Sequence, residues 1–86
     1  MIEKVKMALR ITTIAFDGEL NILINACKAD LSLAGIINDD SKELIQTAII
    51  MYCKSNFGEN ENSDKWQKAY DNLKSALMVS TDYKVV

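Results

Sequence analysis

The residues best able to do chemistry in this chain are two cysteines and a few acids, because the sequence contains no histidine. Cys27 and Cys53 lie in apolar stretches, and neither thiol has the histidine base that usually activates a cysteine nucleophile. The lack of histidine also excludes Ser-His-Asp catalysis and a cysteine–histidine zinc site. We therefore expect two reduced thiols packed in a hydrophobic core.

The acids show no catalytic arrangement either. Asp30 is surrounded by apolar residues at helical spacing, and we expect backbone donors, Trp66 or a tyrosine to satisfy its carboxylate. The adjacent acids Asp39 and Asp40 are explained by a helix start. The three glycines are isolated, which excludes phosphate-binding and dinucleotide-binding loops. The sequence thus predicts no enzyme, no cofactor and no bound metal.

Length and composition indicate one ordinary globular domain over residues 1–86. Hydrophobic residues make up 49% of the chain and charged residues 26%, which is typical of a folded domain. No long uncharged apolar run predicts a transmembrane helix, and charges interrupt the N-terminus where a signal peptide would be apolar. Folding in the cytoplasm is expected. The core is modest at this length, so we expect partners or self-association to add stability.

Hydrophobic periodicity predicts an all-α fold, a small bundle of about four helices. Residues 2–10 place apolar side chains on one face and form a short amphipathic helix. Residues 10–16 break this period and have no partner strand elsewhere. We therefore expect an extended connector whose Ile14 and Phe16 dock on the core.

The second predicted helix begins with Asp17 as its N-cap and runs to Ala34, where Gly35 can end it. Apolar residues occupy both flanks of this helix and leave only a narrow polar strip. An apolar arc this wide indicates either a central helix or one that touches a second partner.

Two further helices and a tail complete the predicted bundle. The third helix opens at Asp40, forms a capping box with Glu43 and stops at Gly58. The fourth helix opens at Ser63 and runs to about residue 79. It carries a stripe typical of a core face, namely Trp66, Ala69, Tyr70, Leu73, Ala76 and Leu77. Residues 80–86 are expected to form a flexible tail, or to dock as a strap through their apolar end.

Several apolar side chains fall outside the predicted core faces. Ile50 and Phe57 are expected to project from the side of the third helix opposite its core face, which points to an interface. The second helix offers a second apolar flank. The predicted subunit-interface residues are Ile22, Ala26, Leu33, Ile50, Phe57, Tyr83, Val85 and Val86.

Charge is distributed unevenly along the chain, although the net charge is only −2. Residues 17–64 hold nine acids against three lysines, whereas both ends are mildly positive. This distribution fits an ordinary solvated surface, or head-to-tail packing of basic ends against the acidic middle of a neighbour. Neither end is basic enough to predict strong nucleic-acid binding.

The order of several short motifs resembles a known family. Residues 48–58 read AIIMYCKSNFG and residues 66–77 read WQKAYDNLKSAL, after the dipeptides Asp30-Leu31 and Gly35-Ile36. Over about residues 5–83, this order and spacing is similar to the small head–tail connector proteins of long-tailed phages and prophages. Such proteins are also called head-completion or DNA-packaging proteins.

The resemblance implies a structural helical subunit without catalysis or cofactor. It implies a ring of copies of the chain, expected to be dodecameric, below the portal protein. Such a ring would extend the DNA channel, hold DNA only as passive content and dock the next head–tail joining protein. The implied location is the head–tail interface of the virion, with the host cytoplasm during assembly, and no membrane is involved.

A protein of a different class, a small helical DNA-binding regulator, is the alternative. The third and fourth predicted helices, joined by a polar turn, could act as a recognition unit. Against this alternative, the fourth helix has no dense basic face, and Arg10 is the only arginine. Rings that form without DNA binding would favour the connector, and a dimer that shifts DNA would favour the regulator.

Overall fold

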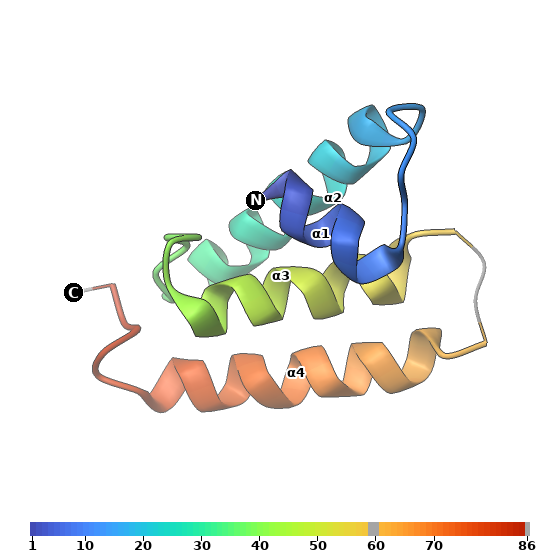
Figure 1. The fold of residues 1–86 in the computed structure, drawn as a ribbon. Helices are drawn as coiled ribbons and strands as arrows, with labels where there is room; N and C mark the ends of the chain where they lie inside the picture. The colour runs from blue at the N-terminus through green and yellow to red at the C-terminus, as the bar shows by residue number, and fades with distance from the viewer. Residues whose placement is uncertain (59–60, 86) are drawn as a thin grey trace.

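Apolar residues recurring every three or four positions build four helices in the computed structural model, which describes residues 1–58 and 61–85. The helices are α1 Ile2–Leu9, α2 Asp17–Leu33, α3 Glu43–Asn56 and α4 Ser63–Val79 (Figure 1). Strand pairing within the described residues is limited to one bridge between Ile36 and Lys84. The predicted all-α bundle of four helices is confirmed.

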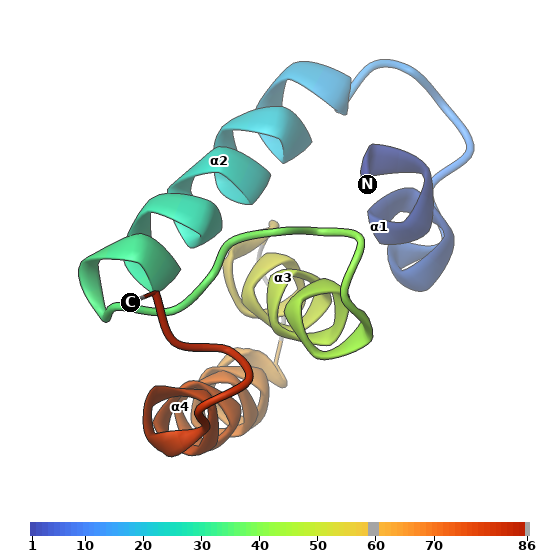
Figure 2. The same cartoon turned by 90° about the vertical axis from the view of Figure 1, so that its left-hand side faces the viewer.

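Helix α3 lies at the centre of the fold. It runs antiparallel to α4 on one side, and α1 and α2 pack against its other side (Figure 1). Figure 2, which looks along α3 and α4, shows α1, α2 and α4 arranged around α3. Of the two alternatives left open for the second helix, a central position or contact with a second partner, the structure does not bear out the central position. Helix α2 lies on the outside, and one of its faces stays exposed.

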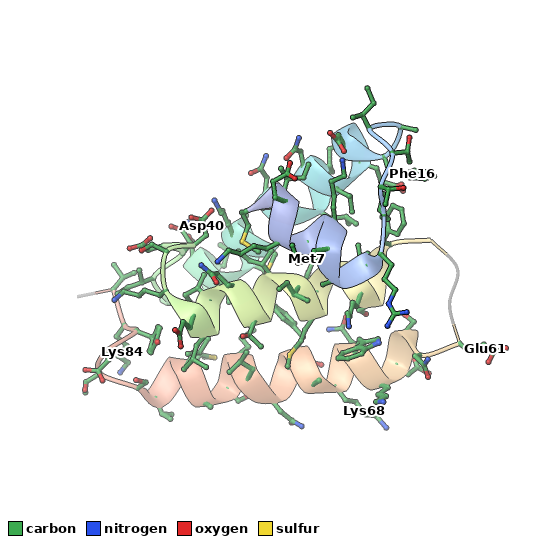
Figure 3. The ribbon with its side chains drawn as sticks, viewed as in Figure 1. Met7, Phe16, Asp40, Glu61, Lys68 and Lys84 are labelled. Carbon is green, nitrogen blue, oxygen red and sulfur yellow. The ribbon has the colours of Figure 1, made fainter. Side chains whose placement is uncertain are left out.

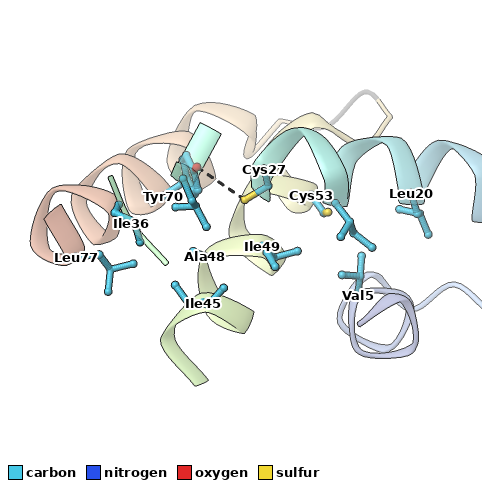
Figure 4. Close-up of a cluster of buried hydrophobic side chains, with 12 residues drawn as sticks. Val5, Leu20, Cys27, Ile36, Ile45, Ala48, Ile49, Cys53, Tyr70 and Leu77 are labelled. Carbon is cyan, nitrogen blue, oxygen red and sulfur yellow. Dashed lines mark hydrogen bonds between the residues drawn. The ribbon is translucent and has the colours of Figure 1, made fainter. Parts of the chain in front are cut away.

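The hydrophobic core is one continuous cluster to which all four helices and the loop after α2 contribute (Figure 4). Most of its members are the apolar residues that the helical spacing predicted. Cys27 and Cys53 are free thiols within it. The buried residues are Val5, Leu20, Ile24, Cys27, Leu31, Ile36, Ile45, Ala48, Ile49, Cys53, Tyr70 and Leu77.

The connector between α1 and α2 does not dock as expected. Arg10 ends α1 in a left-handed conformation with φ of 59°, and the chain then passes outside the helices (Figure 1). Ile14 is 81% exposed, whereas Ile11 packs against the core. The prediction that Ile14 docks on the core is therefore wrong. Phe16 is 43% exposed and lies at the edge of the core, where its ring meets that of Phe57 edge-on at 5.4 Å.

Two acids predicted to cap helices link separate elements instead. Asp17 Oδ1 lies 2.8 Å from Lys6 Nζ of α1, in an ion pair that accounts for a nearly buried lysine. Asp40 Oδ2 accepts a 2.8 Å hydrogen bond from Lys28 Nζ of α2. No side-chain cap is formed at the start of α2 or α3, so the N-cap at Asp17 and the capping box of Asp40 with Glu43 are wrong predictions. In each case a lysine of a neighbouring element engages the carboxylate.

A pair of serines closes the turn between α3 and α4. Ser63 Oγ donates a 2.7 Å hydrogen bond to the Ser55 carbonyl, and Ser55 Oγ donates to the Ser63 carbonyl at 3.2 Å. The N-cap of α4 is Asn62 rather than Ser63. Gly58 has φ of 64°, which glycine adopts readily, and α3 ends beside it as predicted. Residues 59–60 of the predicted polar loop lie outside the described residues.

The C-terminal tail docks as a strap instead of fraying. Ile37 N–H donates to the Tyr83 carbonyl at 2.8 Å, and Val85 N–H donates to the Gly35 carbonyl at 2.9 Å. Tyr83 packs against the core, with Lys42 Nζ 5.8 Å from the centre of its ring. We call residues 83–85 the C-terminal strap. It holds the end of the chain against the loop that follows α2.

Candidate functional site

A group of polar side chains links α2 to α4 at the edge of the core. Tyr70 Oη donates a 2.6 Å hydrogen bond to Asp30 Oδ2, and Lys74 Nζ donates a 3.0 Å hydrogen bond to the same oxygen. Cys27 Sγ lies 3.8 Å from Tyr70 Oη, a contact drawn as a dashed line in Figure 4. A tyrosine partner for Asp30 is thus confirmed. Lys74 is its second partner, and no local pattern could identify a residue 44 positions away.

The surroundings of these side chains determine the protonation states of the Asp30 carboxylate, the Tyr70 hydroxyl and the two thiols. The hydrogen bond from Tyr70 and the contact with Lys74 hold the pKa of Asp30 below its usual range, although partial burial opposes them. Burial and the hydrogen bond to Asp30 raise the pKa of Tyr70 well above its usual range. Burial raises the pKa of Cys27 to about 11 and that of Cys53 to about 12. Both thiols are therefore protonated at neutral pH, in a state that is neither nucleophilic nor ready to bind a metal.

Metal-ligand clusters and membrane spans are both missing from the part of the chain that the structure describes. No three cysteine, aspartate or glutamate side chains gather where they could hold a metal ion. None of the four helices combines the length and apolarity that crossing a bilayer requires. The features of the described residues that another molecule can reach are an exposed face of α2 and a hollow beside Trp66.

One side of α2 is apolar and exposed along most of its length. Ile22 is 70% exposed and Leu33 is 89% exposed. Ala29, which is exposed, and Ala26, which is half-buried, lie between them at helical spacing, on the side of α2 opposite its buried residues. We call these four residues the α2 outer face. The described part of the chain does not cover it.

The other residues predicted for an interface have different positions. Ile50 and Phe57 pack against the core, so the expectation that they project away from it is wrong. The reason is that α1 also packs against α3, which leaves less of α3 exposed than its own periodicity indicates. Tyr83 likewise packs against the core, whereas Val85 is 62% exposed. Val86 lies outside the described residues.

A second surface feature is a hollow at the opposite end of α3 from the C-terminal strap. It forms where α1 and α3 end and α4 begins, and its volume is about 270 Å³. Lys54 Nζ lies 4.3 Å from the centre of the Trp66 ring, and Lys65 Nζ lies 5.5 Å from it. We call this feature the Trp66 hollow. Its lining residues are Ala8, Leu9, Arg10, Lys54, Phe57, Asn62 and Trp66.

The sequence did not predict the Trp66 hollow. The aromatic stripe of the fourth helix predicted a core position for Trp66, and that holds for Tyr70 and Leu77 further along the helix. Trp66 lies instead at the end of the bundle, partly exposed and outside the core cluster. Its distance from two lysine ammonium groups is within the range of cation–π attraction.

The described residues form a small all-helical protein with an exposed apolar helix face and a hollow beside Trp66. The family described as phage connector protein has a sequence model that matches residues 1–84. Because this match covers nearly the whole chain, the chain belongs to the phage connector family, and the resemblance inferred from its motifs is confirmed. It is a structural, head–tail connector type of bacteriophage protein. No curated protein and no solved structure gives a significant match.

Proposed function

We propose that this chain is one subunit of a ring that joins the head and tail of a phage particle below the portal protein. The observation that carries the proposal is the family match over residues 1–84. In this role the ring extends the DNA channel and docks the next joining protein. The protein acts within the phage particle, and the particle is assembled in the host cytoplasm.

The α2 outer face supports this role because a ring subunit needs surface that its own fold leaves uncovered. Ile22 and Leu33 are large and exposed, and covering each would contribute about 1.5–3 kcal/mol. Ala26 and Ala29 are small, so another helix can approach closely between them. We assign this face to contact with a neighbouring subunit or with the portal protein.

The surface of α4 does not favour the alternative of a DNA-binding regulator. Lys65 and Lys68 are interspersed with Asp64 and Asp71, so the exposed side of α4 carries mixed charge. A recognition helix would instead present a dense basic face. α3 and α4 also run antiparallel side by side (Figure 1), unlike the two steeply crossing helices of a helix-turn-helix unit.

The test is complementation of a phage that lacks the gene for this chain. Wild-type protein is expected to restore joined, infectious particles, whereas Ile22→Lys and Leu33→Glu are expected to leave unjoined heads and tails in electron micrographs. Both residues are exposed, so each variant should keep its unfolding free energy within about 0.5 kcal/mol of wild type. The matched control is Ser75→Lys, at an exposed position of α4. Normal particle yield without the protein would overturn the connector role.

A further inference from the structure

We propose that the Trp66 hollow binds the acidic loop between α2 and α3 of a neighbouring copy of this chain. The inference rests on the ring assembly proposed above and assigns one of its subunit contacts. The hollow and the loop lie at opposite ends of the molecule, whose longest dimension is 38 Å. Figure 3 shows Asp40 of the loop at the end away from the start of α4. Two unlike surfaces at opposite ends give a head-to-tail contact, which closes into a ring when the rotation between copies permits.

The hollow presents positive charge beside apolar side chains. Arg10 is part of the lining, and Lys65 Nζ lies 5.5 Å from the centre of the Trp66 ring. Lys54 also lies close to this ring, but it already has a further interaction within its own chain. The nearest acids along the described chain point elsewhere. Glu61 extends away from the molecule in Figure 3, and Asp64 precedes the tryptophan by two helical positions, which places it on another side of α4.

Arg10 gives a second reason to assign a binding role to the hollow. Its backbone is left-handed, with φ of 59°, a conformation that glycine adopts without cost and that an arginine adopts only under strain. Its guanidinium forms no ion pair among the described residues. Folding alone therefore does not explain an arginine at this position, whereas binding a carboxylate of another chain does.

The loop between α2 and α3 offers complementary groups. Asp39 is exposed, and its carboxylate is oriented by the Ser41 backbone N–H at 3.0 Å and the Ser41 hydroxyl at 2.7 Å. Glu43 is exposed at the start of α3, and the neighbouring Leu44 is a large exposed apolar residue. Asp40 is already paired with a lysine of its own chain. Asp39 and Glu43, which lie on either side of Lys42, thus offer two carboxylates to Arg10 and Lys65, and Leu44 offers an apolar side chain to the wall of the hollow.

Charge reversal tests this contact in the same complementation assay. Arg10→Glu and Asp39→Lys are each expected to lower the yield of joined particles at least about tenfold, because like charges then face each other. The double variant is expected to recover most of the yield, since the ion pair forms again with reversed polarity. The matched control, Lys68→Glu, removes an exposed lysine of α4 that does not line the hollow, and it should assemble normally.

Arg10→Gly separates assembly from folding. Glycine relieves the backbone at this position, so the thermal midpoint of the purified variant is expected to rise while its yield of joined particles falls. A variant that is more stable and still assembles normally would overturn the proposed role of Arg10.

Disulfide trapping gives an independent readout. Asp39→Cys combined with Asn62→Cys is expected to give a ladder of cross-linked oligomers from purified particles on a non-reducing gel. The two native cysteines are buried and should not contribute. Each single cysteine variant serves as the control.

If particles join normally but the disulfide ladder and the charge-reversal rescue are both missing, the proposed contact is wrong while the connector role stands. If wild-type protein joins no particles, the connector role itself fails.

Discussion

The side chain of Tyr70 on α4 contacts both α2 and α3. It is buried in the core, its ring meets that of Tyr52 edge-on at 5.3 Å, and its hydroxyl donates to Asp30 of α2. The hydroxyl thus ties α4 to α2, two helices that each pack mainly on α3. Removing the Tyr70 hydroxyl would leave its aromatic ring packed in the core and would remove only the polar link to Asp30.

We expect Tyr70→Phe to lower the unfolding free energy by about 1–2 kcal/mol, because the hydrogen bond to a carboxylate is lost without a cavity. Urea denaturation followed by circular dichroism measures this change. Tyr52→Phe is the control, since no hydrogen bond of the Tyr52 hydroxyl is present in the described structure. An equal loss of unfolding free energy in the two variants would show that the hydrogen bond from Tyr70 to Asp30 does not stabilise the fold.

Asp30 gives the link a pH dependence whose sign follows from its lowered pKa. A carboxyl group with a lower pKa in the folded state stabilises the fold above its unfolded pKa, and this stabilisation is lost as the pH falls through the folded pKa. The difference in unfolding free energy between wild type and Asp30→Asn should therefore be constant from about pH 6 to 8 and shrink below about pH 4. Denaturant unfolding over this range provides the measurement, and a difference that grows on acidification would contradict the assignment.

The sequence could predict which residue types satisfy Asp30, but not which individual partners do so. A tyrosine was among the expected donors and a lysine was not, and both partners, Tyr70 and Lys74, lie on α4, far from Asp30 in the chain. The same limit explains the wrong caps at Asp17 and Asp40. Local capping rules assume that a carboxylate has only its own backbone to bind, and in both cases a lysine of another element binds it instead.

The helices themselves were the most predictable elements, because periodic apolar residues specify a buried face wherever it packs. Their arrangement was less predictable. The sequence of α2 shows how many of its positions are apolar, but it does not show which of them another helix covers. The wide apolar arc therefore could not distinguish a central helix from an outer one. α3 became central because α1, α2 and α4 all pack against it, and no local pattern carries that information.

The C-terminal strap is the element whose stability is easiest to isolate. Val85→Pro removes the N–H that donates to Gly35 and keeps the extended backbone that proline prefers before it. We expect a loss of about 0.5–1.5 kcal/mol, together with faster hydrogen exchange at the Ile37 amide, whose acceptor belongs to the same strap. Val85→Ala keeps the N–H and is the control. Unchanged exchange at Ile37 would show that the strap does not depend on this bond.

For the molecule as a whole, the charge distribution sets the relation to DNA. The net charge is −2, and the lysines of α4 are interspersed with acids. We expect the protein to bind random-sequence duplex DNA no more tightly than about 1 μM at physiological salt, if it forms the passive DNA channel proposed above. Fluorescence anisotropy with a labelled duplex measures this affinity. Submicromolar binding that weakens steeply with salt would contradict a passive channel.

The docked C-terminal strap also determines where a reporter can be attached. Val85 is hydrogen-bonded to Gly35, two residues beyond Leu33 at the end of the α2 outer face. A fluorescent protein or affinity tag attached at Val85 would therefore sit beside this face and obstruct whatever docks there. An untagged chain is the sound choice for imaging phage particles, and a C-terminal fusion that blocks plaque formation would be informative in itself.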